Sequence, residues 1–104
     1  MAQRILVLFN LKDGMSVDDY EEWARTKDIP GVNGLGSVDD FSVFRCGPTL
    51  FTEQTPPYQY VEILDVNDME RFGEEAAQEH MQAIATEFQT DIAADLSFIP
   101  LEKL

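Results

Sequence analysis

The single histidine of this sequence, His80, is the first candidate for chemistry. Histidine is the residue type whose ordinary pKa suits proton transfer near neutral pH. His80 lies among Ala76, Ala77 and Ile84 in a segment with helical periodicity, so we expect its imidazole to border the apolar stripe and to point toward a sheet. It is therefore a candidate general acid or base. The alternative is a half-buried, hydrogen-bonded histidine that packs the helix on the sheet.

Asp28 is the second candidate, in the stretch WARTKDIPGVN at residues 23–33. We expect a helix to end here, because Pro30 disfavours the α conformation for the residue before it. A carboxylate at the C-terminus of a helix meets the negative end of the helix dipole. This unfavourable placement indicates one of two roles. Asp28 either pairs with Arg25 or Lys27 in a solvated turn, or acts as a second proton carrier or substrate-orienting group.

Further side chains could line a pocket between the helices and the sheet. Asn10 lies in the middle of an apolar strand, where its amide needs a hydrogen-bond partner, either a ligand or a neighbouring loop. Arg45 and Glu62 fall on central strands, where they could face the pocket or form a cross-strand ion pair. The rings of Trp23 and Tyr20 could stack on a flat ligand, although they also suit the core. The expected substrate-binding residues are Trp23, Asn10, Arg45, Tyr60, Glu62, Phe9 and Phe44.

Sequence patterns for cofactors and metals are absent. No glycine-rich phosphate loop follows the first predicted strand, and there is no nucleophile elbow. One histidine and one cysteine, Cys46, do not supply a zinc site of the usual kind. We interpret Cys46 as a small buried hydrophobe in a strand. Any chemistry is therefore expected to use no cofactor and no metal, and to be a proton transfer, a cyclisation, a dehydration or an addition of oxygen to an activated aromatic ring.

The composition indicates an ordinary globular protein. Its 104 residues fit one domain over residues 1–104. The excess of 20 acidic over 7 basic residues gives a formal net charge of −13, which repels nucleic-acid phosphates and anionic lipid, so neither partner is expected. One cysteine cannot form an intrachain disulfide, and the apolar run near the N-terminus is far too short to span a bilayer. We therefore predict a cytoplasmic protein.

The predicted elements follow the order β-α-β-β-α-β. The first strand is apolar on both faces, and a capping box begins the first helix at Ser16. A similar box at Asn67 begins the second helix. Pro100 cannot donate to a strand ladder, so the last strand is expected at a sheet edge. The strands are predicted over residues 4–12, 39–46, 59–66 and 96–101, the helices from 16 to about 27 and over 69–92, and a loop or edge hairpin over 47–57.

This order predicts an α+β, ferredoxin-like fold, in which both helices cover one face of an antiparallel sheet. The other face also needs cover, because the first strand is apolar on both sides. A second copy packed sheet against sheet is the economical solution, so we predict a homodimer. Such an interface would also help a chain of this size to complete its core.

The run VLFNLKDGMSVDDYEEWARTKDIPGVNGLGSVDDFSVFR, residues 7–45, resembles the RedY-like proteins of prodigiosin-type pigment clusters. The similarity is carried by NLKDG after the first strand, by the YEEWARTKDIP helix end and by the VN that follows, and it extends over most of the chain. The resemblance implies a dimeric α/β barrel, in a superfamily of cofactor-free monooxygenases, dehydratases, cyclases and isomerases and of members without known activity. EthD-type relatives often have a histidine near the position of Asp28, so the aspartate departs from that pattern.

The resemblance also implies a role with an electron-rich pyrrole or indole intermediate in pigment biosynthesis. The leading hypothesis is a cofactor-free enzyme in which His80 is the general acid or base and Asp28 carries a second proton or orients the substrate. The alternative is a non-catalytic carrier that shields a reactive pyrrole from water and oxygen. A third hypothesis, a structural partner of pathway enzymes, predicts an exposed apolar patch and no enclosed cavity. Turnover separates the first two, because a carrier saturates.

Overall fold

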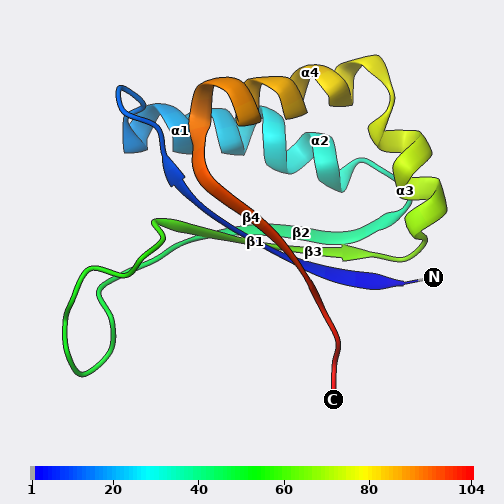
Figure 1. The fold of residues 1–104 in the computed structure, drawn as a ribbon. Coiled ribbons are helices and arrows are strands. Elements are labelled where there is room, and N and C mark those ends of the chain that lie inside the picture. The colour runs from blue at the N-terminus through cyan, green and yellow to red at the C-terminus, as the bar shows by residue number, and fades with distance from the viewer. Residues whose placement is uncertain (1) are drawn as a thin grey trace.

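Four antiparallel strands form one sheet in the order β2-β3-β1-β4 (Figure 1). The structure is a computed structural model that describes residues 2–104. Every pair of neighbouring strands is antiparallel. The predicted order β-α-β-β-α-β and the α+β, ferredoxin-like fold are thereby confirmed. The strands are β1 (Gln3–Leu11), β2 (Val38–Arg45), β3 (Tyr60–Val66) and β4 (Ala93–Leu101).

The helices all lie on one face of the sheet (Figure 1). The first, α1 (Val17–Trp23), begins at Ser16, whose hydroxyl accepts a hydrogen bond from the backbone N–H of Asp19 at 3.1 Å, as the capping box predicts. The other helical segments are the π-helical turn η1 (Ala24–Asp28), α2 (Ile29–Asn33), α3 (Met69–Ala76), α4 (Glu79–Glu87) and a second π-helical turn, η2 (Phe88–Ile92). Within residues 2–104, no helix has the length and apolar character that a membrane span requires.

The chain stays helical through Pro30, so the helix end predicted there is wrong. Ile29 keeps helical dihedral angles, φ −60° and ψ −52°, and its N–H bonds to the carbonyl of Ala24, five residues back. Proline lacks an N–H and clashes with the carbonyl four residues earlier, and the π-helical turn η1 changes the hydrogen-bond ladder just before it. Pro30 then falls in the first turn of α2, where a missing N–H leaves no bond broken.

The second helical region is broken where the sequence predicts one helix over 69–92. Ala77 ends α3, and Gln78 is extended, with φ −64° and ψ 148°, so α4 runs in a new direction (Figure 1). The cap of α3 also differs from the prediction. The carboxylate of Asp68, rather than Asn67, accepts a hydrogen bond from the backbone N–H of Arg71 at 3.1 Å.

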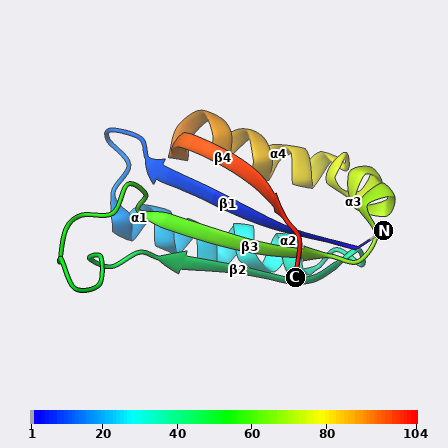
Figure 2. The ribbon, with the colours of Figure 1, turned by 60° about the horizontal axis from the view of Figure 1, so that its bottom comes forward.

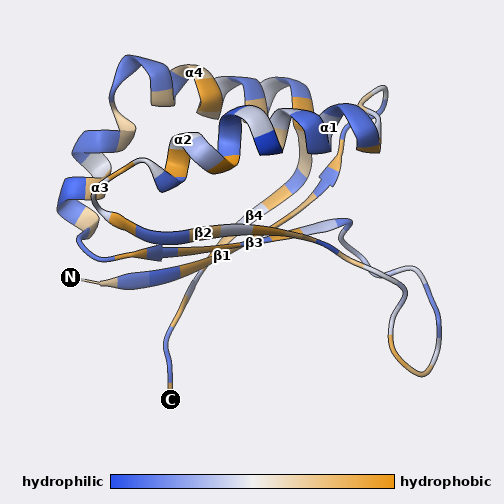
Figure 3. Ribbon diagram, turned by 180° about the vertical axis from the view of Figure 1, so that it is seen from behind, coloured by the Kyte–Doolittle hydropathy of each residue, from blue (hydrophilic) through white to orange (hydrophobic). Residues whose placement is uncertain are grey.

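The two faces of the sheet alternate along each strand. From Tyr60 to Val66, every second residue of β3 is buried under the helices, and the residues between are half-buried. In β1, Val7 and Phe9 take the helix side. Figure 3 shows that apolar and polar residues are interspersed along β2 and β3. Strand β4 lies at the edge of the sheet and contains Pro100, as predicted.

The connection between β2 and β3, residues 46–59, projects beyond the sheet as a long loop (Figure 2). The sequence predicts a loop or edge hairpin over 47–57, and the structure shows a loop. Cys46 follows β2 directly and is half-buried, so its prediction as a buried strand residue is wrong. Leu50 and Phe51 are exposed in this loop.

Candidate acid–base pocket

A pocket of about 180 Å³ opens between α1–η1 and the inner face of β2 and β3. It lies between the helices and the sheet, where the sequence predicts one. Its inner walls are aromatic and aliphatic, and its mouth carries charges. Residues that line it include Tyr20, Glu21, Arg25, Val43, Arg45 and Tyr60.

Glu21 organises the mouth of the pocket. Its carboxylate accepts a hydrogen bond from the hydroxyl of Tyr60 at 2.8 Å and forms ion pairs with Arg25 and Arg45, each at 3.1 Å. The hydrogen bond from Tyr60 lowers the pKa of Glu21, and the charges of Arg45 and Arg25 add to this effect against a partial desolvation. Glu21 is therefore ionised at neutral pH.

Two buried carboxyl groups adjoin the lining of the pocket without belonging to it: Asp28 precedes Ile29, and Glu62 stands opposite Val43. Asp28 exposes 6% and Glu62 4% of its surface. Glu62 stands opposite Val43 in the β2–β3 register, and Arg45 forms its ion pair with Glu21, so the alternative of a cross-strand Arg45–Glu62 ion pair is wrong. No group within residues 2–104 forms a hydrogen bond with Oε2 of Glu62. Asp28 takes part in none of the ion pairs of the described chain, so the solvated, salt-bridged turn is also wrong.

Burial makes both inner carboxyls weak acids. It raises the pKa of Asp28 to about 7. It also raises the pKa of Glu62 well above its usual range, and the charge of Asp28 adds to this rise, which places the two groups near each other. At neutral pH the pair therefore holds a proton that it can give up or regain.

Tyr20 and Trp23 add unpaired polar atoms to this region. The Tyr20 hydroxyl and Nε1 of Trp23 are buried, and neither has a hydrogen-bond partner in the described part of the chain. Burial raises the pKa of Tyr20, and the charges of Glu62 and Asp28 raise it further, so its hydroxyl lies near both carboxyls. Buried polar groups are nearly always hydrogen-bonded, so these atoms call for a partner such as a water molecule or a ligand.

Simple spacings bring these groups together. Tyr20, Ala24 and Asp28 recur every four residues and are all buried, so α1 and η1 present them to the sheet side by side. Tyr60 and Glu62 are two residues apart in β3 and share its helix-facing side. The pocket is thus formed where one helix face meets one strand face.

Trp23 and Phe9, two of the expected substrate-binding residues, belong to the hydrophobic core. The ring of Phe9 stacks on Tyr60 with 5.5 Å between centroids, and Trp23 stacks on Phe88 at 6.2 Å. Tyr20 meets Tyr60 edge to face at 4.8 Å. Trp23 and Phe9 therefore support the two tyrosines that line the pocket.

His80 lies away from the pocket. It is exposed in the first turn of α4, so the expectation that its imidazole points toward the sheet is wrong. The break between α3 and α4 resets the helical phase, and Met81 is the buried residue of this turn. The apolar neighbours of His80 in the sequence belong to two differently directed helices.

Phe44 and Asn10 also lie elsewhere. Phe44 is 51% exposed and pairs with Val61, on the side of the sheet away from the helices, so its expected place in the pocket is wrong. The Asn10 amide donates to the carbonyl of Pro57 at 3.0 Å and to the carboxylate of Asp95 at 3.1 Å. Asn10 therefore holds a neighbouring loop, which is the alternative that its sequence position left open.

Sequence reasoning places Glu21 among the solvent-facing charges of the first helix and misses its part in the site. One signal was available, because Arg25 follows four residues later at the spacing of a helical ion pair. The contributions of Arg45 and Tyr60 come from distant strands and leave no local pattern. Within residues 2–104, no group of three or more His, Cys, Asp or Glu side chains is arranged to hold a metal ion.

These observations define a class of protein: a small α+β domain with a ferredoxin-like fold and a pocket between helices and sheet. Residues 3–104 match the model of one family, described as REDY-like protein HapK. The chain therefore belongs to this family, and the resemblance seen in the sequence is confirmed.

Solved structures share the fold. HapK from Hahella chejuensis is 24% identical, with a TM-score of 0.77, and the match covers 100% of this chain and 93% of that one. The protein At3g17210 from Arabidopsis thaliana is 19% identical, with a TM-score of 0.76 and coverage of 98% and 95%. A dimeric ferredoxin-like protein of unknown function from Thermobifida fusca is 15% identical, with a TM-score of 0.70 and coverage of 99% and 92%. No curated protein matches the chain.

Proposed function

We propose that this protein is a cofactor-free enzyme that acts on a pyrrole- or indole-type intermediate of pigment biosynthesis by acid–base chemistry, with Asp28 and Glu62 as its proton carriers. The single observation that carries the proposal is the burial of two carboxyl groups beside one pocket without a compensating cation among the described residues. A proton carrier works best when its pKa lies near the working pH, and burial gives Asp28 that property.

The walls of the pocket suit a flat, electron-rich ring. Tyr20 and Tyr60 present aromatic surfaces, and Val43 and Ile29 add aliphatic ones. Arg45 and Arg25 stand at the mouth, where they can contact an oxygen-bearing substituent that reaches toward solvent. The family supports the pathway, because RedY-like proteins resemble this chain and are associated with prodigiosin-type pigments.

Gene replacement in the producing strain tests the proposal. The gene is deleted and restored as the wild type, Asp28→Asn, Glu62→Gln or His80→Ala. We expect one intermediate to accumulate in the deletion strain and with both carboxyl variants, with flux through the step reduced by about 10² or more, the usual contribution of acid–base catalysis. His80→Ala is the matched control, because His80 is exposed, and it should restore the pigment. Full flux with folded Asp28→Asn and Glu62→Gln proteins would sink the proposal.

The carrier hypothesis is the second candidate, because unpaired polar atoms at Tyr20 and Trp23 could hold a ligand without changing it. Purified protein incubated with the accumulated intermediate separates the two. An enzyme converts many equivalents of the compound, whereas a carrier binds about one equivalent per site and returns it unchanged. Product below one equivalent, with saturable binding, would favour the carrier.

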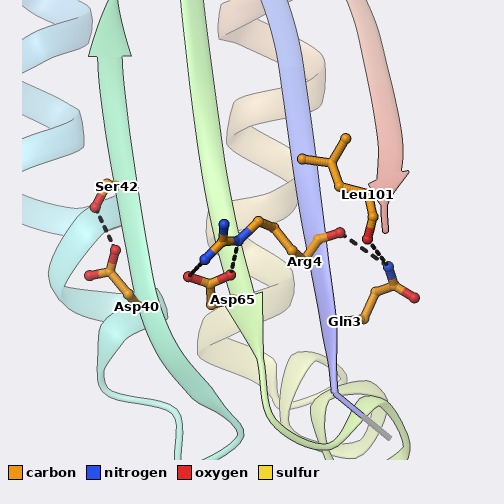
Figure 4. A network of polar contacts seen from close by, with 6 residues as sticks. All are labelled: Gln3, Arg4, Asp40, Ser42, Asp65 and Leu101. Carbon is orange, nitrogen blue, oxygen red and sulfur yellow. Dashed lines mark hydrogen bonds and ion pairs between the residues drawn. The ribbon is translucent and has the colours of Figure 1, made fainter. Parts of the chain in front are cut away.

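We also propose that the protein works as a homodimer through the open face of the sheet. That face carries no helix within the described chain (Figure 2) and has a half-exposed apolar surface with a polar end, where Arg4 pairs with Asp65 at 2.6 Å (Figure 4). Light scattering should show a dimer that Leu8→Lys converts to monomer and that Leu50→Lys, in the exposed loop, leaves intact. A monomeric wild type would contradict the proposal. The apolar residues of this face include Leu6, Leu8, Phe44, Val61, Ile63 and Ile99.

A further inference from the structure

We infer that the Asp28–Glu62 pair binds the positively charged, N–H-bearing end of a planar ligand, and that a bound cation drives one proton from the pair into solution. Suitable groups are an amidinium, an iminium or a protonated nitrogen heteroaromatic ring. The inference rests on the proposed function in that it concerns the same pocket, and it adds the class of substrate and its orientation.

The pair lacks a counter-charge within the described chain. An ionised carboxylate accepts hydrogen bonds only, and Oε2 of Glu62 is buried with no donor from residues 2–104. The arginines that line the pocket, Arg25 and Arg45, are engaged by Glu21 at 3.1 Å, and their side chains are 68% and 63% exposed. A buried charge needs a partner to be stable. A positive group on the ligand would supply it.

Tyr20 is an independent sign that a ligand reaches this depth. The residue is fully buried and lines the pocket, and its hydroxyl has no hydrogen-bond partner among the described residues. A hydroxyl can accept an N–H as well as donate a proton. The Tyr20 oxygen and the Glu62 carboxylate are therefore two buried acceptors without donors from the described residues, and an amidinium offers two N–H groups to them.

Apolar neighbours leave the charge of the pair uncompensated. Val7 of β1 stands directly opposite Glu62 in the sheet and belongs to the hydrophobic core, which also contains Phe88 of η2 and against which Ile84 of α4 packs. At the mouth, one carboxylate neutralises part of the charge of two arginines. The ionisable residues that line the pocket are Tyr20 and Glu21 of α1, Arg25 of η1, Arg45 of β2 and Tyr60 of β3.

The size of the pocket limits the inner part of the ligand. An apolar cavity of roughly 150 Å³ holds one benzene ring, and this pocket has about 180 Å³. One ring with a small nitrogen substituent therefore fits inside. Any remaining part of the ligand must extend past Glu21 toward Arg25 and Arg45. The site thus orients a substrate with its nitrogen end inward and its oxygen-bearing end outward.

The proton balance follows from the state of the empty pair. Near pH 6 both carboxyls hold their protons, because burial raises the pKa of Asp28 to about 7 and that of Glu62 well above its usual range. A permanently cationic ligand replaces one of these two protons, which passes to the buffer, so the complex contains the cation and a pair with one negative charge. A neutral weak base instead takes one proton from the pair, and none is released. Affinity for a permanent cation should therefore rise with pH until the pair is ionised without ligand.

Calorimetry with three probes of one shape tests the inference. Benzamidinium, benzamide and benzoate carry a positive, a neutral and a negative end on the same ring. Titrations in two buffers of different ionisation enthalpy, from about pH 6 to about pH 8, give the protons released per ligand. We expect benzamidinium to bind at least about tenfold more tightly than benzamide, the range of a hydrogen bond to a charged group, and benzoate not to bind. About one proton should leave per benzamidinium at the low end of this range, and none with benzamide.

Two controls separate the pocket from the acidic surface. Trp23 is the single tryptophan, so its indole N–H signal in a nuclear magnetic resonance spectrum reports on the region of the site. Benzamidinium should shift this signal in the wild type and in Glu22→Gln, where an exposed charge of the same helix is removed. Glu62→Gln should lower benzamidinium affinity by about tenfold and leave benzamide affinity unchanged.

The inference is overturned if benzamidinium fails to bind, if it binds no better than benzamide, or if wild-type binding releases no proton. The last readout needs no variant, so an unfolded Glu62→Gln does not affect it. The proposed function fails in a different way, because it requires loss of turnover in the carboxyl variants. Loss of turnover without a preference for cations would leave the proton carriers in place and remove this substrate class.

Discussion

The carboxyl groups at the two depths of one pocket behave in opposite ways. Glu21, at the mouth, has a hydroxyl and two guanidinium groups within 3.1 Å, and these contacts lower its pKa. Asp28 and Glu62, inside, lack ion pairs within the described chain, and burial raises the pKa of both. The contrast has two causes: burial raises the pKa of the inner pair, and the hydrogen bond from Tyr60 lowers that of Glu21.

This contrast distinguishes a structural role from a functional one. A carboxylate whose charge is balanced by its neighbours has little tendency to change protonation state, and it fixes the geometry of the groups around it. A buried carboxyl without a partner destabilises the fold when it ionises, and such a cost persists in proteins mostly at functional sites. Glu21 therefore shapes the entrance, and the inner pair is the part to which we assign proton transfer and the binding of a positive group.

The largest effect is expected from Asp28→Asn at high pH. The pKa of Asp28 rises from 3.8 to about 7 on folding, so the folded state binds the proton more tightly and wild-type stability falls as pH rises from about 4 to about 7. That shift corresponds to a loss of up to roughly 4 kcal/mol. Asp28→Asn has no charge to bury, so urea unfolding should show it to be more stable than the wild type by up to this amount near pH 8 and about equal near pH 4.

The control for this prediction is Glu22→Gln, which removes one negative charge from an exposed position of α1. It separates the effect of burial from that of the net charge of −13, because a lower net charge relieves repulsion at any site. If both variants gain the same stability at high pH, the inner carboxyl is not the source of the pH dependence.

Periodicity explains why the fold was predictable and His80 was not. The β1 pattern, the Ser16 cap and the edge position of Pro100 are local signals that the structure confirms. The placement of His80 depended on a helix without interruption. A break of two residues, at Ala77 and Gln78, changes the phase of all that follows, and neither position is a glycine or a proline that would signal it.

Asp28 and Glu62 show the reverse case. The sequence identifies both as candidate site residues, but not the burial and proximity that the structure gives them. The sequence identifies Asp28 through an unfavourable helix end, whereas the structure buries it in a continuing helical stretch. Its spacing of four from Ala24 was the better signal. Glu62 follows Tyr60 by two residues in a strand, and this alone places it on the inner face. The proximity of the two carboxyls is a tertiary fact and leaves no trace in either pattern.

The second-largest effect on stability is expected from Tyr60→Phe, with Tyr20→Phe as its comparison. Tyr60→Phe removes a hydrogen bond of 2.8 Å to the ionised Glu21 and should lower the free energy of unfolding by about 1.5–3 kcal/mol, the usual range for a bond to a charged group. Tyr20→Phe removes a buried hydroxyl without a partner in the described chain, so its effect should lie within about 1 kcal/mol of zero. Urea unfolding of both variants at one pH measures the difference. Equal losses would mean that the Tyr20 hydroxyl has a partner in solution, such as a water molecule that bridges it to Glu62.

The smallest effect is expected from Glu21→Gln. Its partners Arg25 and Arg45 are 68% and 63% exposed, and ion pairs of exposed side chains contribute about 1 kcal/mol or less. The glutamine can still accept the Tyr60 hydroxyl, so most of that hydrogen bond is kept. The loss should shrink further in about 1 M NaCl, where the screening length falls to about 3 Å. Unfolding in low and high salt, with Glu22→Gln as the matched variant, measures it. A loss that salt leaves unchanged would mean that Glu21 is shielded like the inner pair, and the contrast between mouth and depth would then rest on partners alone.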